Sequence, residues 1–374
     1  MSLKCRDIVD IMNKIAPENL QEKWDNSGLN IGNKDSEIKK IMVALDIIDD
    51  VIDEAIENNV DIIVTHHPIL LFKDLKNITT DTDIGLKIYK LIQNNISVYS
   101  AHTSYDIVFG GTNDILAEIL GLSDIEILKE TNFEKTFKIV VYVPYNNKDD
   151  VVSAIGEAFG GCIGNYSNCM FLSKGEGQFK PLEGSNPYIG SVGDIEKVKE
   201  YKIETIVTEN NISNVLNAIY KTHCYEEPAI DIIPMNVKGK RYGIGRIGNL
   251  KNNMNFIDFA KFVKKKLNID NIRISVDDEN TVINKVAICT GAGSDFFDIA
   301  KSKGADVYIT GDIKFHEAQK AKQLGLCVID GTHYATENIA IPVLAEYLKK
   351  ELNNINEEIE ILVSKVNGQT FKNI

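Results

Sequence analysis

Two kinds of apolar pattern alternate in the first third of the chain. The continuous apolar runs at 41–45 and 62–64 are typical of buried strands, and the segment 49–59 between them places apolar residues at helical spacing. A helix at 86–94 then leads into a strand at 96–100. Strand, helix and strand joined by short connections predict βαβ units in a mainly parallel sheet.

The same order of elements returns in the last third of the chain. Strands are predicted at 286–290, 306–310 and 326–329, and a long amphipathic helix runs to about residue 352. Laid over the first region, this one repeats four residues in matching places: Asp53 and Asp298, Ala55 and Ala300, Asp61 and Asp306, and Thr65 and Thr310. The two regions are therefore predicted to be related βαβ-type halves of one layered α/β domain.

The pattern between the two halves is different and resembles a split βαβ module. Its predicted elements are a strand at 137–143, a helix at 149–159, strands among glycine-rich turns to about 191, a helical charge run, a strand at 203–207, a helix at 213–221 and a strand at 231–234. This order predicts an inserted ferredoxin-like (PII-like) α+β domain. The predicted boundaries are 1–130 for the first half, 131–238 for the insertion and 239–374 for the second half.

Composition narrows the class of protein. With 374 residues, 44% hydrophobic and 25% charged, the chain is long enough for two or three globular domains. A formal net charge of -13 argues against a broad cationic face for DNA or RNA. The six cysteines are scattered and form no CxxC pair, which predicts reduced thiols. The sequence has no apolar run of roughly 20 residues and no signal peptide, so we expect a cytoplasmic protein without membrane contact.

Histidines and carboxylates follow the predicted strands. His66 and His67 come directly after the strand at 62–64, at the edge of the sheet where α/β proteins usually bind ligands. One strand later, each half offers a histidine followed four residues on by a carboxylate: His102 with Asp106, and His333 with Glu337. The loop 24–29, which holds the only tryptophan, is explained by an Asx turn with an aromatic anchor and needs no catalytic role.

These residue types together favour a metal site. A spacing of four places both side chains on one helical face, where they can bind one ion or two neighbouring ions. Mixed imidazole and carboxylate ligands suit zinc, iron, manganese, cobalt or nickel. Because ligating histidines must be neutral, metal affinity is expected to weaken as the pH falls toward the ordinary histidine pKa of about 6.5. Each pair alone is more often a hydrogen-bonded surface feature than a set of metal ligands.

Longer blocks of the sequence resemble the NIF-three family, whose members are called GTP cyclohydrolase I type 2 homologues. The blocks that carry this resemblance are WDNSGLNIG (24–32), DIIVTHHPIL (61–70), AHTSYDIVFGGTND (101–114), DVYITGDIKFHEA (306–318) and VIDGTHYATE (328–337). The segments 161–190 and 223–234 resemble the inserted domain of the longer bacterial members.

The resemblance implies a site for two divalent metal ions. At the positions that match the family's ligands, the resemblance implies that Glu337 bridges both ions. His66 and Asp106 are then the remaining ligands of one ion, and His67 and His333 are those of the other. His102 matches a further histidine near the metals and is the candidate catalytic residue, as a proton shuttle or a substrate contact. A histidine that is only hydrogen-bonded at a strand end is the alternative. The resemblance also implies ring-like homohexamers, and for His316 we expect a supporting or structural role.

Two functions follow as expectations. The first is a dinuclear metal-dependent hydrolase of a nucleotide or related small molecule, with a reaction like that of GTP cyclohydrolase I type 2 as one candidate. The alternative is a metal-binding regulatory or scaffold protein with a ligand-sensing inserted domain. The sequence contains no GxxxxGK[ST] phosphate loop, and the turn at 291–294 is a weak substitute.

Overall fold

The computed structural model describes residues 2–70, 77–353 and 359–371 and divides the chain into two compact units. The first unit joins Met1–Asn132 to Tyr242–Ile374, and the second is Phe133–Arg241. Each unit has hydrophobic clusters of its own. Among the helices described, none has both the length and the apolar character needed to cross a membrane.

The first sheet of the first unit has the strand order β1-β4-β3-β2-β15 and is parallel from β4 to β15. Its strands are β1 (Gly28–Ile31), β2 (Lys40–Ala44), β3 (Ile62–Thr65), β4 (Ser97–Ser100) and β15 (Glu360–Val363). The helices α2 (Asp49–Glu57) and α3 (Asp83–Gln93) pack on one face, and α1 (Cys5–Ile15) and α12 (Ala340–Asn353) pack on the other. Burial on both faces explains the continuous apolar strands.

The second sheet has the order β11-β14-β13-β12-β10-β5, with β12, β13 and β14 parallel. Its strands are β5 (Leu122–Phe133), β10 (Arg241–Asn255), β11 (Arg273–Ser275), β12 (Val282–Ile288), β13 (Val307–Thr310) and β14 (Cys327–Asp330). Helices again cover both faces, namely α5 (Thr112–Ile119) and α8 (Phe256–Lys266) on one, and α9 (Phe297–Ser302) and α10 (Phe315–Gln323) on the other.

The residues that repeat in the sequence make equivalent contacts in the two halves. The Asp61 carboxylate accepts hydrogen bonds from the backbone at the start of β2, and the Asp306 carboxylate does the same in the middle of β12. Ala55 and Ala300 are both fully buried, and each carbonyl accepts a hydrogen bond from the residue five positions later. These two pairs of identities therefore mark equivalent structural positions.

Arg246 of β10 is fully buried beneath the segment that follows Asp106. Its guanidinium makes a two-point ion pair with Asp114, with N–O distances of 2.7 and 2.8 Å. The remaining N–H groups donate to backbone carbonyls, including that of Val108 at 2.8 Å. This interaction ties the second sheet to the chain leaving α4 (Thr103–Ile107).

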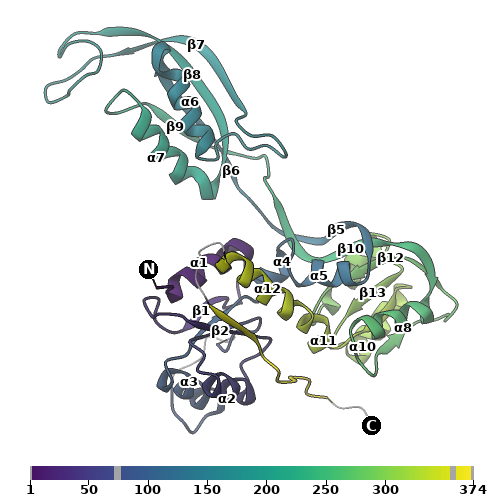
Figure 1. Cartoon of the computed structure of the whole chain (residues 1–374). Helices are drawn as coiled ribbons and strands as arrows, with labels where there is room; N and C mark the ends of the chain where they lie inside the picture. The colour runs from purple at the N-terminus through teal and green to yellow at the C-terminus, as the bar shows by residue number, and fades with distance from the viewer. Residues whose placement is uncertain (1, 71–76, 354–358, 372–374) are drawn as a thin grey trace. The chain divides into compact units, whose positions relative to one another are not determined.

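The second unit is a four-stranded antiparallel sheet with two helices on one face (Figure 1). Its elements are β6 (Thr136–Pro144), α6 (Lys148–Glu157), β7 (Met170–Phe179), β8 (Glu196–Thr208), α7 (Ile212–Thr222) and β9 (Ile230–Met235). The strands lie in the order β7-β8-β6-β9.

One secondary-structure prediction in the second unit is wrong. The charge run before residue 203 is the first half of strand β8 rather than a helix. Its buried residues, Val198 and Glu200, recur every second position, which is the period of a strand, and the charged residues between them face solvent. The density of charge concealed this alternation in the sequence.

Candidate metal centre

Three elements of the first unit bring the predicted ligands together. His66 and His67 follow β3, whereas Asp106 lies in the short helix α4. His333 and Glu337 lie one turn apart on α11 (His333–Asn338), directly beyond β14. Both short helices begin just beyond the carboxyl end of a parallel strand, so the two sheets contribute to one cluster.

His67, His333 and Glu337 converge on one point. The Nε2 atoms of His67 and His333 each lie 3.1 Å from Glu337 Oε2 and 3.4 Å from each other. Despite these distances, Glu337 Oε2 is buried and has no hydrogen-bond partner of acceptable geometry. Two imidazole nitrogens and a carboxylate oxygen aimed at a shared point are the donor set of a divalent transition metal.

A second point of convergence involves the other oxygen of the same carboxylate. His66 Nε2 lies 3.6 Å from Asp106 Oδ1 and 3.7 Å from Glu337 Oε1. His66 is 1% exposed, and its Nε2 is another buried atom without a hydrogen-bond partner. A buried polar atom without a partner is costly, and a bound cation at each point would satisfy both of these atoms.

The outer nitrogens of the three histidines are all held by acceptors. His66 Nδ1 lies 2.8 Å from the Ala101 carbonyl oxygen, His67 Nδ1 lies 2.7 Å from Asp46 Oδ1, and His333 Nδ1 lies 2.8 Å from Asp312 Oδ2. An acceptor at Nδ1 keeps the proton there and leaves the Nε2 lone pair directed at the cluster. This arrangement is usual for metal-binding histidines.

His102 adjoins the cluster and is oriented by Asp25. Its Nδ1 lies 2.8 Å from Asp25 Oδ1, and its ring centroid lies 5.2 Å from that of His66. Asp25 is buried and also accepts hydrogen bonds from Thr103 and Ser27. One nitrogen each of His66, His67 and His102 can be chosen within 4.8 Å of one another, so His102 reaches the same space as the predicted ligands.

The loop 24–29 orients His102 in place of forming the predicted Asx turn at Asp25. The Asp25 carboxylate accepts from the N–H of the next residue, Asn26, whereas an Asx turn needs the N–H two residues on, and the same carboxylate holds His102. Trp24 is 55% exposed and contacts the edge of the His102 ring, so it does not anchor the loop in a hydrophobic core. Burial alone would raise the Asp25 pKa, but the hydrogen bond with His102 and its charge hold that pKa well below the ordinary value.

The carboxylates and histidines of the site shift one another's pKa values. Burial alone would lower the pKa of His67, but Asp46 and Glu337 raise it to about 10. Burial would likewise lower the pKa of His333, which its contacts with Glu337 and Asp312 raise to about 9. The Glu337 pKa, which burial alone would raise, is held well below its usual range by the surrounding histidines. Without another cation, the carboxylates therefore draw protons onto the histidines.

Metal affinity is expected to rise with pH up to about pH 9–10. In metal-free protein His67 and His333 stay protonated below these pKa values, and each must lose its proton to bind metal. We expect zinc affinity to increase between about pH 6 and about pH 8, with protons released on binding. Competition with a chromophoric chelator measures the zinc affinity, and calorimetry in two buffers of different ionisation enthalpy measures the number of protons released. Affinity independent of pH over this range would contradict histidine ligation.

The turn at 291–294 has a packing role in this site. Gly291 has a φ of 67°, and a Cβ at this position would lie 2.2 Å from Glu337 Oε1. The Gly291 N–H donates to the Thr336 hydroxyl, which fixes the start of the turn against α11. The glycine therefore allows the backbone to approach the Glu337 carboxylate. This packing role differs from the phosphate binding considered for the turn in the sequence.

Sequence reasoning missed the partners that orient the histidines. Asp25, Asp46 and Asp312 were not predicted as site residues, although Asp46 and Asp312 each stand just beyond a strand of the repeat. His316 is exposed on α10 with its Nδ1 3.0 Å from Gln319 Oε1. Asp46 and Asp312 each stand two residues beyond the end of a parallel strand, and this place was the available signal.

Fold and cluster together define an α/β protein with a candidate metal site at the strand ends of two sheets. The family described as Duf34/NIF3 (NGG1p interacting factor 3) matches residues 3–369. A Bacillus subtilis protein named GTP cyclohydrolase 1 type 2 homolog is 42% identical over 370 residues, which cover 99% of this chain and 98% of that protein. A similarly named Halalkalibacterium halodurans protein is 42% identical over 97% of both chains.

Solved structures agree with these sequence matches. A Bacillus cereus protein related to NIF3 superimposes with a TM-score of 0.93 at 36% identity and covers 100% of both chains. A Staphylococcus aureus protein superimposes with a TM-score of 0.80 at 32% identity, covering 100% of this chain and 99% of that one. The chain belongs to the Duf34/NIF3 family, which confirms the resemblance of the sequence blocks.

Proposed function

We propose that the first unit holds two divalent metal ions that share Glu337. His66 and Asp106 would complete one site, and His67 and His333 the other. The observation that carries this proposal is the pair of buried atoms without hydrogen-bond partners, His66 Nε2 and Glu337 Oε2, one at each point of convergence. Zinc, iron, manganese, cobalt and nickel all suit this donor set.

The same arrangement supports hydrolysis. Two ions bound side by side lower the pKa of a water molecule and supply a nucleophile at neutral pH. With Nδ1 held by Asp25, His102 keeps Nε2 free to take up a proton or to contact a substrate. The buried Asp25 fixes the tautomer and the ring direction of His102. These are the roles that a metal-dependent hydrolase needs.

The substrate that we propose is a nucleotide or a related small molecule. The curated relatives carry the name GTP cyclohydrolase 1 type 2 homolog, and in a cyclohydrolase reaction water opens the imidazole ring of GTP and formate leaves. Forming a pterin also requires rearrangement of the sugar and closure of a new ring. Hydrolysis of the imidazole ring is therefore the part of the reaction that this site supports best.

Incubating metal-loaded protein with GTP tests the cyclohydrolase reaction. We expect formate release that a His67→Ala variant lacks, because that variant loses one ligand of the shared site. Formate is measured enzymatically and pterin by its fluorescence. If wild-type protein with full metal occupancy releases no more formate and no more pterin than the variant, the protein is not a GTP cyclohydrolase.

We further propose that the second unit is a ferredoxin-like insertion and that the chain assembles as a homohexamer. The order β6-α6-β7-β8-α7-β9 and the antiparallel sheet β7-β8-β6-β9 support the ferredoxin-like topology. A cavity within this unit favours the second candidate function, a metal-binding regulatory protein with a ligand-sensing domain. Thermal stabilisation by a ligand that survives removal of the metals would distinguish this function from hydrolysis.

A further inference from the structure

The sheet of the second unit has one face without helices. Ile139, Val141 and Val143 of β6 pack with α6 and α7 in the core of the unit. Tyr142 lies between two of these residues and therefore points to the opposite face. Glu200 and Lys202 of β8 lie on that same face, because Ile203 faces the core. The helix-free face thus carries polar and aromatic side chains.

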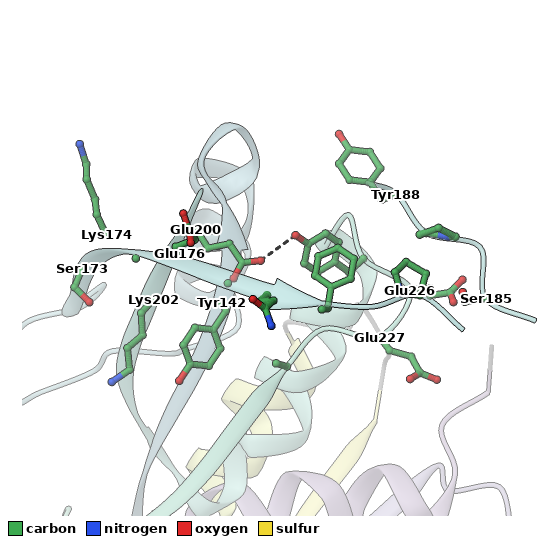
Figure 2. A pocket seen from close by; sticks show the side chains of 18 residues that line it. Tyr142, Ser173, Lys174, Glu176, Ser185, Tyr188, Glu200, Lys202, Glu226 and Glu227 are labelled. Atoms are coloured by element: carbon green, nitrogen blue, oxygen red, sulfur yellow. Dashed lines mark hydrogen bonds between the residues drawn. The ribbon is translucent and has the colours of Figure 1, made fainter. Parts of the chain in front are cut away.

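A cavity of about 550 Å³ lies on this face, within the size range of sites for small organic molecules. Strands β7 and β8 form its floor, and parts of the segments 181–188 and 225–229 close its sides (Figure 2). Four aromatic side chains line it: Tyr142, Phe179, Tyr188 and Tyr225. The cavity is therefore a candidate ligand site, separate from the metal centre in sequence and in residues.

Glu200 is a buried carboxylate in this cavity. It is 6% exposed, and its Oε1 accepts a hydrogen bond of 2.9 Å from the Tyr225 hydroxyl (Figure 2). Its Oε2 occupies the space that a side chain at Gly177 would fill, 2.1 Å from the position of a Cβ there. No hydrogen bond or ion pair to Oε2 is formed by the described residues. One charged oxygen thus remains available to a ligand.

The basic residues of the cavity are engaged elsewhere. Lys202 Nζ lies 3.4 Å from Glu204 Oε1, and Lys174 Nζ lies over the ring of Tyr145 at 5.6 Å. Figure 2 shows both lysine side chains directed away from the Glu200 carboxylate. Among the further carboxylates that line the cavity, Glu176 pairs with Lys197, and Glu226 and Glu227 have no ion pair with a described residue. The charge presented to a ligand is therefore negative.

The aromatic wall is held in place by a neutral histidine. The Tyr225 N–H donates to His223 Nδ1 at 3.0 Å, so the proton of His223 is on Nε2, which donates to the Tyr142 carbonyl at 3.0 Å. Burial lowers the pKa of His223, which agrees with the neutral form. Tyr225 also makes an edge contact with Phe179, with ring centroids 5.5 Å apart. The cavity is thus formed before any ligand binds.

We propose that this cavity binds a small organic cation, a molecule with a flat or apolar body and an amine or guanidinium group. The cationic group would pair with Glu200 Oε2, and the body would lie against the tyrosine and phenylalanine rings. Aromatic faces beside a carboxylate are the usual recognition elements for such cations. A phosphate or carboxylate ligand would be repelled by Glu200. The proposal names the ligand class for the sensing function and does not depend on hydrolysis.

Two probes with the same body and opposite charge test the proposal on the full-length, metal-loaded protein. Tyramine is a cation, and 3-(4-hydroxyphenyl)propionate is its anionic counterpart. We expect calorimetry to detect tyramine binding at one site per chain and no binding of the anion. Agmatine, a guanidinium probe, is measured in parallel. Formate release from GTP, measured in the same samples, reports separately on the metal centre.

The Glu200→Gln variant should weaken tyramine binding at least tenfold, because glutamine keeps the bond with Tyr225 but loses the charge. The matched control is Glu183→Gln, which removes an equal charge from an exposed residue that does not line the cavity. Tyr188→Ala, at an exposed residue, should weaken tyramine binding without affecting folding.

The proposal is wrong if neither cation binds, if the anion binds equally well, or if the Glu200→Gln variant binds tyramine like the Glu183→Gln variant. It is also wrong if these variants instead dissociate the oligomer in ultracentrifugation, which would assign the cavity to contacts between copies.

Discussion

Replacing Glu337 with glutamine is expected to remove both metal ions, reducing two bound ions per chain to fewer than one. Each carboxylate oxygen lies at a different point of convergence, Oε1 toward His66 and Oε2 toward His67 and His333. Glutamine has nearly the same shape, but it is neutral and its amide nitrogen cannot serve as a ligand. Elemental analysis of protein purified without chelator measures the loss.

The control for this variant is Glu346→Gln, which makes the same change at an exposed position of α12. It should keep the metal content of the wild-type protein. His66→Ala and His67→Ala should each lower the metal content without unfolding the protein, since each histidine belongs to a different point of convergence. A Glu337→Gln variant that retains two ions would show that Glu337 does not bridge them.

Replacing Arg246 with methionine is expected to destabilise the protein by about 3–5 kcal/mol, the usual effect of removing one partner from a buried ion pair. Asp114 would be left with an unpaired carboxylate, and the Val108 carbonyl would lose a donor. Because Val108 follows α4, we also expect looser positioning of Asp106 and weaker metal binding. Denaturant unfolding of chelated protein measures the free energy.

Lys251→Met, at an exposed position on the same strand, serves as the control and should change the free energy by less than about 0.5 kcal/mol. Adding Asp114→Leu to the Arg246→Met variant should recover part of the stability, because it removes the unpaired charge. If Arg246→Met costs no more than Lys251→Met, the ion pair contributes nothing to the fold.

The strands and their ends were predictable because the local signals are strong. The runs at 62–64 and 307–309 carry no charged residue, as expected of strands buried on both faces, and the buried β3 and β13 are observed there. A ligand directly after such a strand falls at the carboxyl edge of the sheet. This rule predicts that His66, His67 and the segment of His333 lie close together, and the His67 and His333 rings are in contact in the structure.

The orienting carboxylates depended on register and could not be predicted in the same way. Asp25 and His102 are 77 residues apart, and their contact requires β1 to lie antiparallel to β4 with a bulge. The stretch 241–275, which forms β10, α8 and β11, was also left without predicted elements. Arg246 lies there, and its buried partner Asp114 is 132 residues away. Such pairs are set by sheet pairing, which local patterns do not encode.

Crystals of protein purified without chelator, measured at the absorption edge of the bound metal, test the central claim most directly. We predict two anomalous peaks in the first unit, one among His66, Asp106 and Glu337 and one among His67, His333 and Glu337. A map with no peak at these residues, or with a single peak that does not touch Glu337, would contradict the shared two-metal site.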